Sequence, residues 1–369
     1  MSSADIIKII VYQASKLFWL FPIDNNKIYL LNFDGTIIGH DAKAVAEWVK
    51  QNNKSYKLIW GVKKNIGPES DHLDNVNYVR INSLRGLFHI LTAKILIYNI
   101  NPPSYFAYRK DQKLVNTWHG FIGKKIGKYT KGYSKRQFNL ATCFMSETAS
   151  NTKNIRDAFE YNGMILEAGA PRNDVFFSDN CDIKKKKIIK RFHTENKKIL
   201  LYAPTFRGDF KQERQTINFE VAVKALSDRF GGEWVVFVRA HPMIINKLSF
   251  AGNNIIDVSF YNDTQELLCA ADIVITDFSS VFFDFSLTKR PVFLYFDDIS
   301  QYGTERGFLF SVFDLPFSIS KNNEELKHNI LSFNEIEYRD RLNNFYNKVG
   351  NFTNGHACEK LFDYIEWKE

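Results

Sequence analysis

Hydroxyl and carboxyl side chains gather where one apolar segment of the chain ends. The apolar run that closes at Thr276 predicts a buried parallel strand, and Asp277, Ser279 and Ser280 follow it. The next residues are apolar with helical spacing, so a helix is expected to begin here. Hydroxyls, free backbone N–H groups and the positive end of a helix suit a phosphate group, although an ordinary capped turn would have the same sequence.

Two further strand ends in the same half of the chain carry cations and hydroxyls. Thr205 and Arg207 follow one apolar segment, and Arg239 and His241 close the next. A guanidinium can bind a phosphate through two parallel hydrogen bonds. Because the carboxyl ends of parallel strands meet at one edge of a sheet, these side chains are expected to form a diphosphate site, with further charge from Arg306.

A histidine in the first half of the chain could act as a general base. Trp118, His119 and Gly120 come directly after the predicted strand 114–117, again at the carboxyl edge of a sheet. The unperturbed pKa of an imidazole lies near neutrality, which suits proton abstraction, and Gly120 permits the close approach of substrate or backbone. A structural histidine is the alternative.

Basic residues surround this histidine. Nine Lys and Arg residues lie between Arg109 and Arg136, against one acidic residue, Asp111. This imbalance could attract a polyanion or acidic lipid head groups, and the candidate contacts for an acceptor are Trp118, Gly120, Lys124 and Lys125. A solvated surface would carry the same charges.

A proline-containing turn lies between the two halves of the chain. Gly169, Pro171 and Arg172 open it, and Asn173 or Asp174 could cap a following helix. We expect this turn to stabilise a domain, with Arg172 as a candidate phosphate contact.

Size and composition restrict the class of protein. A chain of 369 residues is too long for one domain with a single ordinary core, and a hydrophobic content of 45% is enough to form two hydrophobic cores. A net charge of +8 favours an anionic partner, but no nucleic-acid-binding signature is present, so nucleic acid is not expected. The four cysteines show no metal-ligand spacing, and no phosphate-binding Gly-rich loop or acidic metal cluster appears, so neither a metal nor a cofactor is expected.

The N-terminal segment from Ile6 to Phe21 is apolar but too short and too charged to span a membrane. Lys8 and Lys16 interrupt it and Pro22 ends it, and it is not a cleavable signal peptide. It could lie in a membrane interface or pack as a helix on the first domain.

Alternating strand and helix patterns run through both halves and predict an α/β protein with mainly parallel sheets. We expect two doubly wound Rossmann-like domains facing each other across a cleft. Residues 1–182 form the N-terminal domain, residues 183–350 the C-terminal domain, and residues 351–369 a helix that crosses back. Expected strands are 27–33, 56–61, 77–80, 95–99, 114–117, 198–203, 234–239, 272–276 and 291–295; expected helices are 41–51, 84–91, 219–229, 264–270, 281–287 and 357–367.

Together these motifs resemble the CDP-glycerol glycerophosphotransferase family, the teichoic acid primases and polymerases. Each motif is short, but their order and rough spacing match from residue 117 to residue 308. The matching segments are Trp118-His119-Gly120, Gly169 with Pro171-Arg172-Asn173-Asp174, Tyr202 to Arg207, His241-Pro242, Ile275 to Ser280 with Phe283-Asp284, and Arg306-Gly307-Phe308.

The resemblance implies a metal-independent enzyme of the GT-B fold, peripheral on the inner face of the bacterial cell membrane. It implies transfer of an alditol phosphate from a CDP-alditol to a hydroxyl of a lipid-linked or polymeric acceptor, with release of CMP. His119 would deprotonate the acceptor in the N-terminal, membrane-facing domain. The C-terminal domain would hold the donor diphosphate, through His241, Thr276, Ser279 and Ser280, with Arg207 as a further contact.

Alternatives remain open at this stage. The family usually continues its first motif with Thr-Pro-Leu-Lys, whereas this chain has Phe121 to Lys124, which leaves the acceptor undefined. The donor could be CDP-glycerol or CDP-ribitol. A GT-B sugar transferase or epimerase would share the diphosphate site, and a non-enzymatic polyanion-binding protein would share the charge. Self-association into a homo-oligomer is also open.

Overall fold

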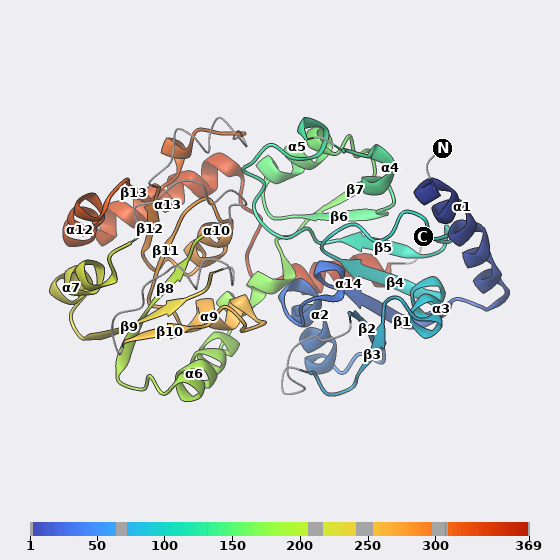
Figure 1. Cartoon of the computed structure of the whole chain (residues 1–369), viewed down its shortest axis with the longest axis horizontal. Coiled ribbons are helices and arrows are strands. Elements are labelled where there is room, and N and C mark those ends of the chain that lie inside the picture. The colour runs from blue at the N-terminus through green and yellow to red at the C-terminus, as the bar shows by residue number, and fades with distance from the viewer. Residues whose placement is uncertain are drawn as a thin grey trace. The chain divides into compact units, whose positions relative to one another are not determined.

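The computed structural model describes residues 3–63, 72–130, 132–205, 217–240, 254–296, 307 and 309–367. The chain divides into two compact units (Figure 1). Unit 1 comprises Met1–His119, Ile126–Phe177 and Asn351–Glu369, and unit 2 comprises Gly120–Lys125 and Ser178–Gly350. The predicted division lay after residue 182 and did not include the excursion of residues 120–125 into unit 2.

Unit 1 is built on a seven-stranded sheet in the order β3-β2-β1-β4-β5-β6-β7, with every neighbouring pair parallel. Its central strands are apolar on both faces because helices cover both faces. The strands are β1 (Asp24–Leu31), β2 (Lys57–Val62), β3 (Val76–Arg80), β4 (Ala93–Tyr98), β5 (Lys113–Asn116), β6 (Cys143–Ser146) and β7 (Met164–Glu167).

The helices of unit 1 begin at residues that cap them. The Ser83 hydroxyl accepts from the Gly86 N–H and starts α3, and Thr148 does the same for α5. The helices are α1 (Ser3–Ser15), α2 (His40–Gln51), α3 (Leu84–Thr92), α4 (Lys135–Phe138), α5 (Ala149–Ala158) and α14 (Ala357–Glu366), with 3-10 turns η1 (Lys16–Leu20) and η5 (Pro171–Phe177) among them.

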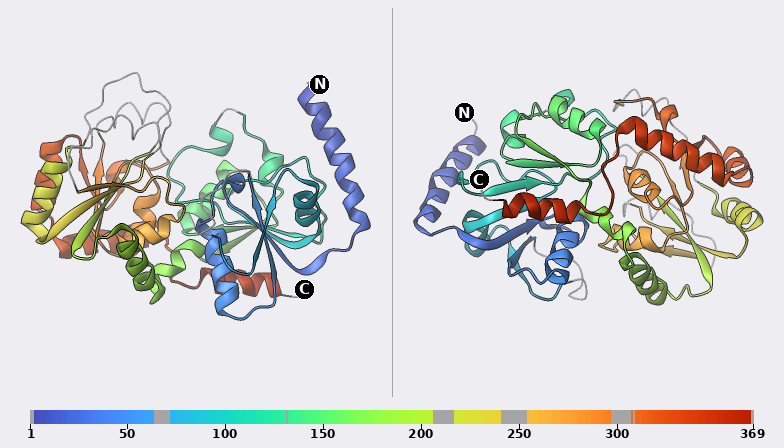
Figure 2. Two further views of the ribbon diagram at one scale, coloured as in Figure 1. Left: turned by 60° about the horizontal axis from the view of Figure 1, so that its bottom comes forward. Right: turned by 180° about the vertical axis from the view of Figure 1, so that it is seen from behind.

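The C-terminal helix α14 completes the core of unit 1 and contacts α2 and η5 (Figure 2). Phe362 stacks on Trp48 with ring centroids 4.4 Å apart. The Asp174 carboxylate accepts from the Ala357 and Cys358 N–H groups at 3.0 and 2.8 Å, so it caps α14. The expected capping role of the 169–174 turn is therefore present, but the capped helix comes from the far end of the chain.

Unit 2 is built on a six-stranded parallel sheet in the order β10-β9-β8-β11-β12-β13. Its strands are β8 (Lys197–Ala203), β9 (Glu233–Val238), β10 (Ile255–Asp257), β11 (Ile273–Thr276), β12 (Val292–Tyr295) and β13 (Ser318–Ser320). Its helices are α6 (Asn180–Phe192), α7 (Phe219–Phe230), α9 (Thr264–Ala270), α10 (Val281–Ser286), α12 (Asn323–Leu331) and α13 (Glu335–Val349).

Both sheets confirm the predicted α/β class with doubly wound parallel strands. In each sheet the strand order reverses once: between β1 and β4 in unit 1, and between β8 and β11 in unit 2. Open α/β sheets bind ligands beyond the carboxyl ends of the strands at such a point. Within the described residues, no helix combines the length and apolarity needed to cross a membrane.

Candidate active site

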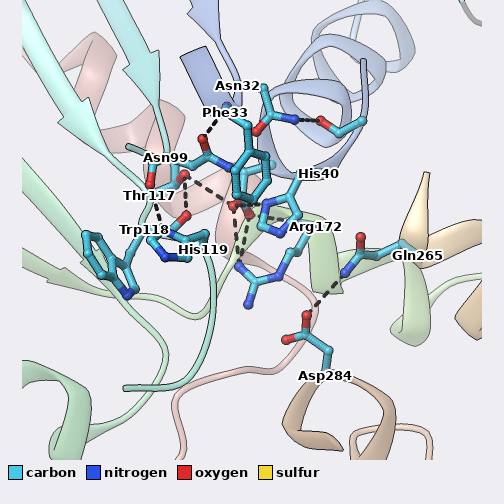
Figure 3. A network of polar contacts seen from close by, with 12 residues as sticks. Asn32, Phe33, His40, Asn99, Thr117, Trp118, His119, Arg172, Gln265 and Asp284 are labelled. Carbon is cyan, nitrogen blue, oxygen red and sulfur yellow. Dashed lines mark hydrogen bonds and ion pairs between the residues drawn. The ribbon is translucent and has the colours of Figure 1, made fainter. Parts of the chain in front are cut away.

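His119 lies at the carboxyl edge of the unit 1 sheet, three residues after β5. Its Nδ1 lies 3.0 Å from the carbonyl oxygen of Asn99, the residue that follows β4 (Figure 3). A carbonyl can only accept, so Nδ1 carries the proton and donates it. Nε2 is then left with a lone pair, which is the state that a general base requires.

Asn99 joins His119 to the end of β1. The Asn99 side-chain oxygen accepts from the Phe33 N–H at 2.8 Å, while its main-chain oxygen holds the imidazole. The ring centroid of His119 lies 5.8 Å from that of Phe33 and 4.1 Å from that of Trp118. The imidazole is thus held at the switch point of the sheet by strands β1, β4 and β5.

Burial keeps the imidazole neutral. Desolvation lowers the pKa of His119 to about 4, against the opposing effect of the hydrogen bond to Asn99. The neighbouring charges of His40 and Arg172 act in the same direction as burial. At neutral pH His119 is therefore an unprotonated base.

Several residues around His119 have backbone conformations that side chains rarely adopt. Trp118 has φ 56°, Phe33 43°, Asp34 52° and His40 59°. The Trp118 N–H donates to the Asn116 side-chain oxygen at 2.8 Å, which holds this turn in place. Such strain persists where surrounding contacts fix it, and it concentrates at functional sites.

A buried ionic network lies next to this turn. His40 Nδ1 lies 2.9 Å from Asp41 Oδ2, and the Thr117 hydroxyl donates to the same oxygen at 3.2 Å. Arg172 pairs with Asp41 at 3.3 Å and with Glu147, and its side chain is fully buried. Burial alone would raise the pKa of Asp41, but the charges of Arg172 and His40 outweigh it and lower the pKa to about 2.

These contacts correct one expectation from the sequence. Arg172, which we considered as a phosphate contact, has its guanidinium enclosed between two carboxylates and 0% of its side chain exposed. It pairs instead with Asp41, the carboxylate that accepts a hydrogen bond from Thr117 just before His119. The other expectation for the 169–174 segment, a stabilising turn, agrees with this placement.

Thr205 and Asp277 meet at the switch point of the unit 2 sheet. Asp277 Oδ1 accepts from the Thr205 N–H at 2.8 Å and from the Thr205 hydroxyl at 2.6 Å. Thr205 comes two residues after β8 and Asp277 directly after β11. The carboxylate therefore holds the loop that follows β8 against the end of the neighbouring strand β11.

Ser279 and Ser280 precede α10, which begins at Val281 as the sequence predicted. Ser280 has a helical backbone and its hydroxyl makes no capping hydrogen bond, and Ser279 Oγ accepts from Val281 N at 3.5 Å. Ser280 therefore does not cap α10 through its side chain. Both serine side chains are partly exposed. They follow β11, which is the neighbour of β8 in the sheet, and Thr205 follows β8.

Gly120 packs closely against Ser280 within unit 2. A Cβ atom on Gly120 would lie 2.3 Å from Ser280 Oγ and 2.8 Å from Ser280 Cβ, and Gly120 has φ +142°. Only glycine fits such a backbone and such a contact. The group that Gly120 admits is therefore a side chain of the predicted donor site, and the preceding residue in the chain is His119.

The other residues expected at the donor site have structural contacts. Thr276 is fully buried and donates its hydroxyl to the Ala203 carbonyl at 2.6 Å, which leaves its phosphate role without support. Arg239 donates to the carbonyls of Val258 and Tyr261 and so joins β9 to the loop after β10. These bonds give Arg239 a structural role.

The candidate acceptor residues after Gly120 extend along unit 2. Phe121 stacks on Phe283 of α10 with ring centroids 5.0 Å apart, the Lys125 N–H donates to the Gly307 carbonyl at 3.3 Å, and Lys124 is partly exposed. Arg207, His241 and Arg306 lie outside the described residues, and their roles stay predictions. Across the described part of the chain, no group of three His, Cys, Asp or Glu residues could hold a metal ion.

Sequence reasoning missed the residues that hold the imidazole. Asn99, Phe33 and His40 make the contacts around His119, yet none stood out in the sequence. A signal was available, because Phe33 and Asn99 are the last residues of two strands predicted to lie in the same sheet. The buried pairing of Asp41 with Arg172 had no such signal.

Comparisons with known proteins agree along almost the whole chain. The model of the family described as CDP-Glycerol:Poly(glycerophosphate) glycerophosphotransferase matches residues 13–367. A teichoic acid glycerol-phosphate transferase of Staphylococcus aureus is 29% identical over 96% of this chain and 96% of its own length. A teichoic acid poly(glycerol phosphate) polymerase of Bacillus subtilis is 28% identical over 97% of this chain, which spans 51% of that relative.

A solved structure of the wall teichoic acid polymerase TagF, soaked with CDPG, is similar throughout. It has a TM-score of 0.83 and 26% identity, and the match covers 99% of this chain and 98% of that one. This likeness accords with the two doubly wound sheets described above.

Proposed function

Because the chain belongs to the CDP-glycerol:poly(glycerophosphate) glycerophosphotransferase family, we propose that it transfers glycerol phosphate from CDP-glycerol to a hydroxyl of a lipid-linked or polymeric acceptor in teichoic acid synthesis. The supporting observation is a neutral, oriented imidazole at the switch point of one sheet and a hydroxyl-rich turn at the switch point of the other. These positions are where open α/β sheets bind ligands.

The proposed reaction begins with the acceptor hydroxyl. Nε2 of His119 takes its proton while the hydroxyl oxygen attacks the phosphorus that carries glycerol. The bond from that phosphorus to the CMP oxygen breaks, a phosphodiester forms, and CMP leaves. The Asn99 carbonyl holds Nδ1–H throughout and favours the imidazolium once it has formed.

The donor diphosphate is proposed to lie against unit 2. Thr205, held by Asp277, together with Ser279 and Ser280, offers hydroxyl and N–H donors for the phosphate oxygens. His241, Arg207 and Arg306 are proposed to add positive charge as CMP leaves. Gly120 packs against Ser280 within unit 2, so the proposed donor site includes the residue that follows His119 in the chain.

The test is CMP release from CDP-glycerol with a glycerol-phosphate-primed lipid acceptor. His119→Gln should lower kcat by about 10²-fold or more, the usual contribution of a general base. His356→Gln, an exposed histidine before α14, is the matched control and should keep full activity. Full activity of His119→Gln would refute the proposed base.

Donor identity can be separated from the chemistry by ligand-induced stabilisation. CDP-glycerol should raise the thermal unfolding midpoint more than CDP-ribitol, and UDP-sugars should leave it unchanged. A larger shift with CDP-ribitol would make the protein a ribitol-phosphate transferase, and a shift only with UDP-sugars would favour a sugar transferase or epimerase. We also propose that no divalent metal takes part, so that EDTA should leave the rate unchanged.

We further propose that α1 attaches the protein to the inner membrane face. The following turn η1 is fastened to unit 1, because Arg109 Nη2 donates to the Phe18 and Phe21 carbonyls at 2.6 and 2.7 Å. By contrast α1 leaves Ile7 and Ile10 60% exposed. An apolar helix face that the unit itself does not cover suits a lipid surface.

Flotation with anionic liposomes tests this attachment. Replacing both Ile7 and Ile10 by Glu should lower membrane partitioning at least about tenfold, because a buried Ile side chain contributes about 1.5–3 kcal/mol. Ile336→Glu, on α13 and 75% exposed, is the control and should bind as the wild type does. Unchanged binding of the double variant would move the attachment to the basic residues between Arg109 and Arg136.

A further inference from the structure

One aromatic side chain at the carboxyl edge of the unit 2 sheet is exposed to solvent. Phe260 lies three residues after the end of β10 and is 75% exposed. Phe278 follows β11 and Phe296 follows β12 at the same edge. These two rings stack on each other with centroids 4.2 Å apart, and the residues are only 3% and 1% exposed. Of these three rings, that of Phe260 is thus the one available at the edge where open α/β sheets bind ligands.

The main chain on both sides of the exposed ring is held in place. The Ser259 hydroxyl accepts from the Ala240 N–H at 2.9 Å, which ties the loop after β10 to the end of β9. Arg239 donates to the carbonyls of Val258 and Tyr261, one on each side of the exposed ring. A phenyl ring on a fixed loop loses little conformational freedom when a ligand covers it. The loop therefore presents the ring as a preorganised flat surface.

The position of β10 sets the distance between this ring and the proposed phosphate site. In the sheet order β10-β9-β8-β11, β10 is two places from β8, and Thr205 follows β8 (Figure 1). Neighbouring strands lie about 4.8 Å apart, so the carboxyl ends of β10 and β8 are about 10 Å apart. In a nucleoside diphosphate the ribose separates the base from the two phosphates. A nucleotide laid along this edge with its diphosphate at Thr205 can therefore bring its base to the end of β10.

We propose that the Phe260 ring stacks on the cytosine base of the donor. This inference rests on the proposed function, because it needs a cytidine nucleotide bound to unit 2. Aromatic side chains stack on the flat face of nucleobases. The base lies away from the reacting phosphorus, so the contact is made equally in the ground state and the transition state. Such a contact acts on donor binding and leaves the chemical step unchanged.

Titration calorimetry of the full-length protein with CMP and with CDP-glycerol tests the contact. Phe260→Ala should weaken the binding of both by about 5- to 150-fold, the usual effect of losing one base–aromatic stack. Phe260→Leu keeps an apolar side chain but has no aromatic face, so it should also bind at least about fivefold more weakly. Phe260→Trp should bind as tightly as the wild type. Phe313→Ala, which removes a ring that is 69% exposed on the 3-10 turn η6 (Val312–Asp314), is the matched control and should bind as the wild type does.

Two further measurements separate a base contact from a general effect on the site. In the transfer assay, Phe260→Ala should raise the KM for CDP-glycerol by the same factor and leave kcat near the wild-type value. Inorganic pyrophosphate has the two phosphates without the base, so it should inhibit the wild type and Phe260→Ala equally. The thermal unfolding midpoint of Phe260→Ala should match that of the wild type, because the ring it removes buries little surface.

Different outcomes would overturn different claims. Wild-type affinity of Phe260→Ala for CMP would refute the stack and leave the proposed function standing. Wild-type affinity of Phe260→Leu would show that the ring acts only as apolar surface, and an equal loss of CMP and pyrophosphate binding would show that the residue acts on the phosphate site; each result contradicts the stack. A wild-type protein that binds neither CMP nor CDP-glycerol would refute the proposed function and the stack together.

Discussion

Replacing Gly120 by Ala tests the close packing of the segment that follows His119. A Cβ atom there would lie 2.8 Å from Ser280 Cβ, which side-chain rotation cannot move away, and φ is +142°. Backbone strain at such an angle costs about 1–3 kcal/mol, and forced overpacking costs about 1–3 kcal/mol more. We therefore expect Gly120→Ala to lower the free energy of unfolding by roughly 2–6 kcal/mol.

Two further variants separate the clash from the strain. Gly231 in the same unit also has a positive φ of +68°, but nothing lies within 4 Å of its Cβ position, so Gly231→Ala should cost only about 1–2 kcal/mol. The double variant Gly120→Ala/Ser280→Gly removes both clashing atoms. It should regain the part of the unfolding free energy that is lost to overpacking, while the part lost to backbone strain stays lost.

Urea unfolding followed by circular dichroism measures these differences. The reasoning is refuted if Gly120→Ala is no less stable than Gly231→Ala. It is also refuted if Ser280→Gly gives the same change in the presence and absence of Gly120→Ala, because the contact would then carry no coupling energy.

Three more predictions concern the polar residues of the two sheets. Burial lowers the pKa of His119 to about 4, so on acidification the imidazole takes up a proton in the unfolded chain before it does so in the folded protein. The free energy of unfolding of the wild type should therefore fall by up to about 3 kcal/mol between pH 6.5 and 4. Unfolding experiments across that range should show that His119→Gln lacks this loss. Arg172→Met leaves Asp41 and Glu147 without their cation and should cost about 3–5 kcal/mol at pH 7, with a smaller deficit near pH 4 as the carboxylates take up protons; an equal deficit at both values would contradict the ionic account. Asp277→Ala removes both hydrogen bonds that hold Thr205 and should raise the KM for CDP-glycerol about tenfold or more, whereas an unchanged donor KM would remove Thr205 from the proposed site.

Strand ends were predictable because each apolar segment stops at a polar or strained residue. His119 and Thr205 could be placed at sheet edges in this way, since parallel strands bring their carboxyl ends to one side. Helix starts were equally readable, as the beginning of α10 at Val281 shows. Strand ends and helix starts depend on residues that are neighbours in the chain, so the spacing of apolar and polar residues in the sequence is enough to predict them.

The partners of polar side chains could not be predicted in the same way. The Thr276 hydroxyl was expected to face a ligand, yet it satisfies the Ala203 carbonyl of the adjacent strand. Arg172 was expected near phosphate, yet it pairs with Asp41, which is far away in sequence. A buried donor takes the nearest available acceptor, and which acceptor is nearest depends on the tertiary structure.

The return of α14 to unit 1 has a consequence for synthesis. Leu361 and Phe362 are 0% and 1% exposed in the same core as Ile28 of β1, although more than three hundred residues separate them in the chain. On the ribosome, β1 emerges more than three hundred residues before α14, so the apolar face of β1 must wait for that helix. Unit 2 can complete its sheet before that helix appears, so the unit begun first is finished last. Chaperones that shield apolar surface should therefore engage the nascent chain through unit 1.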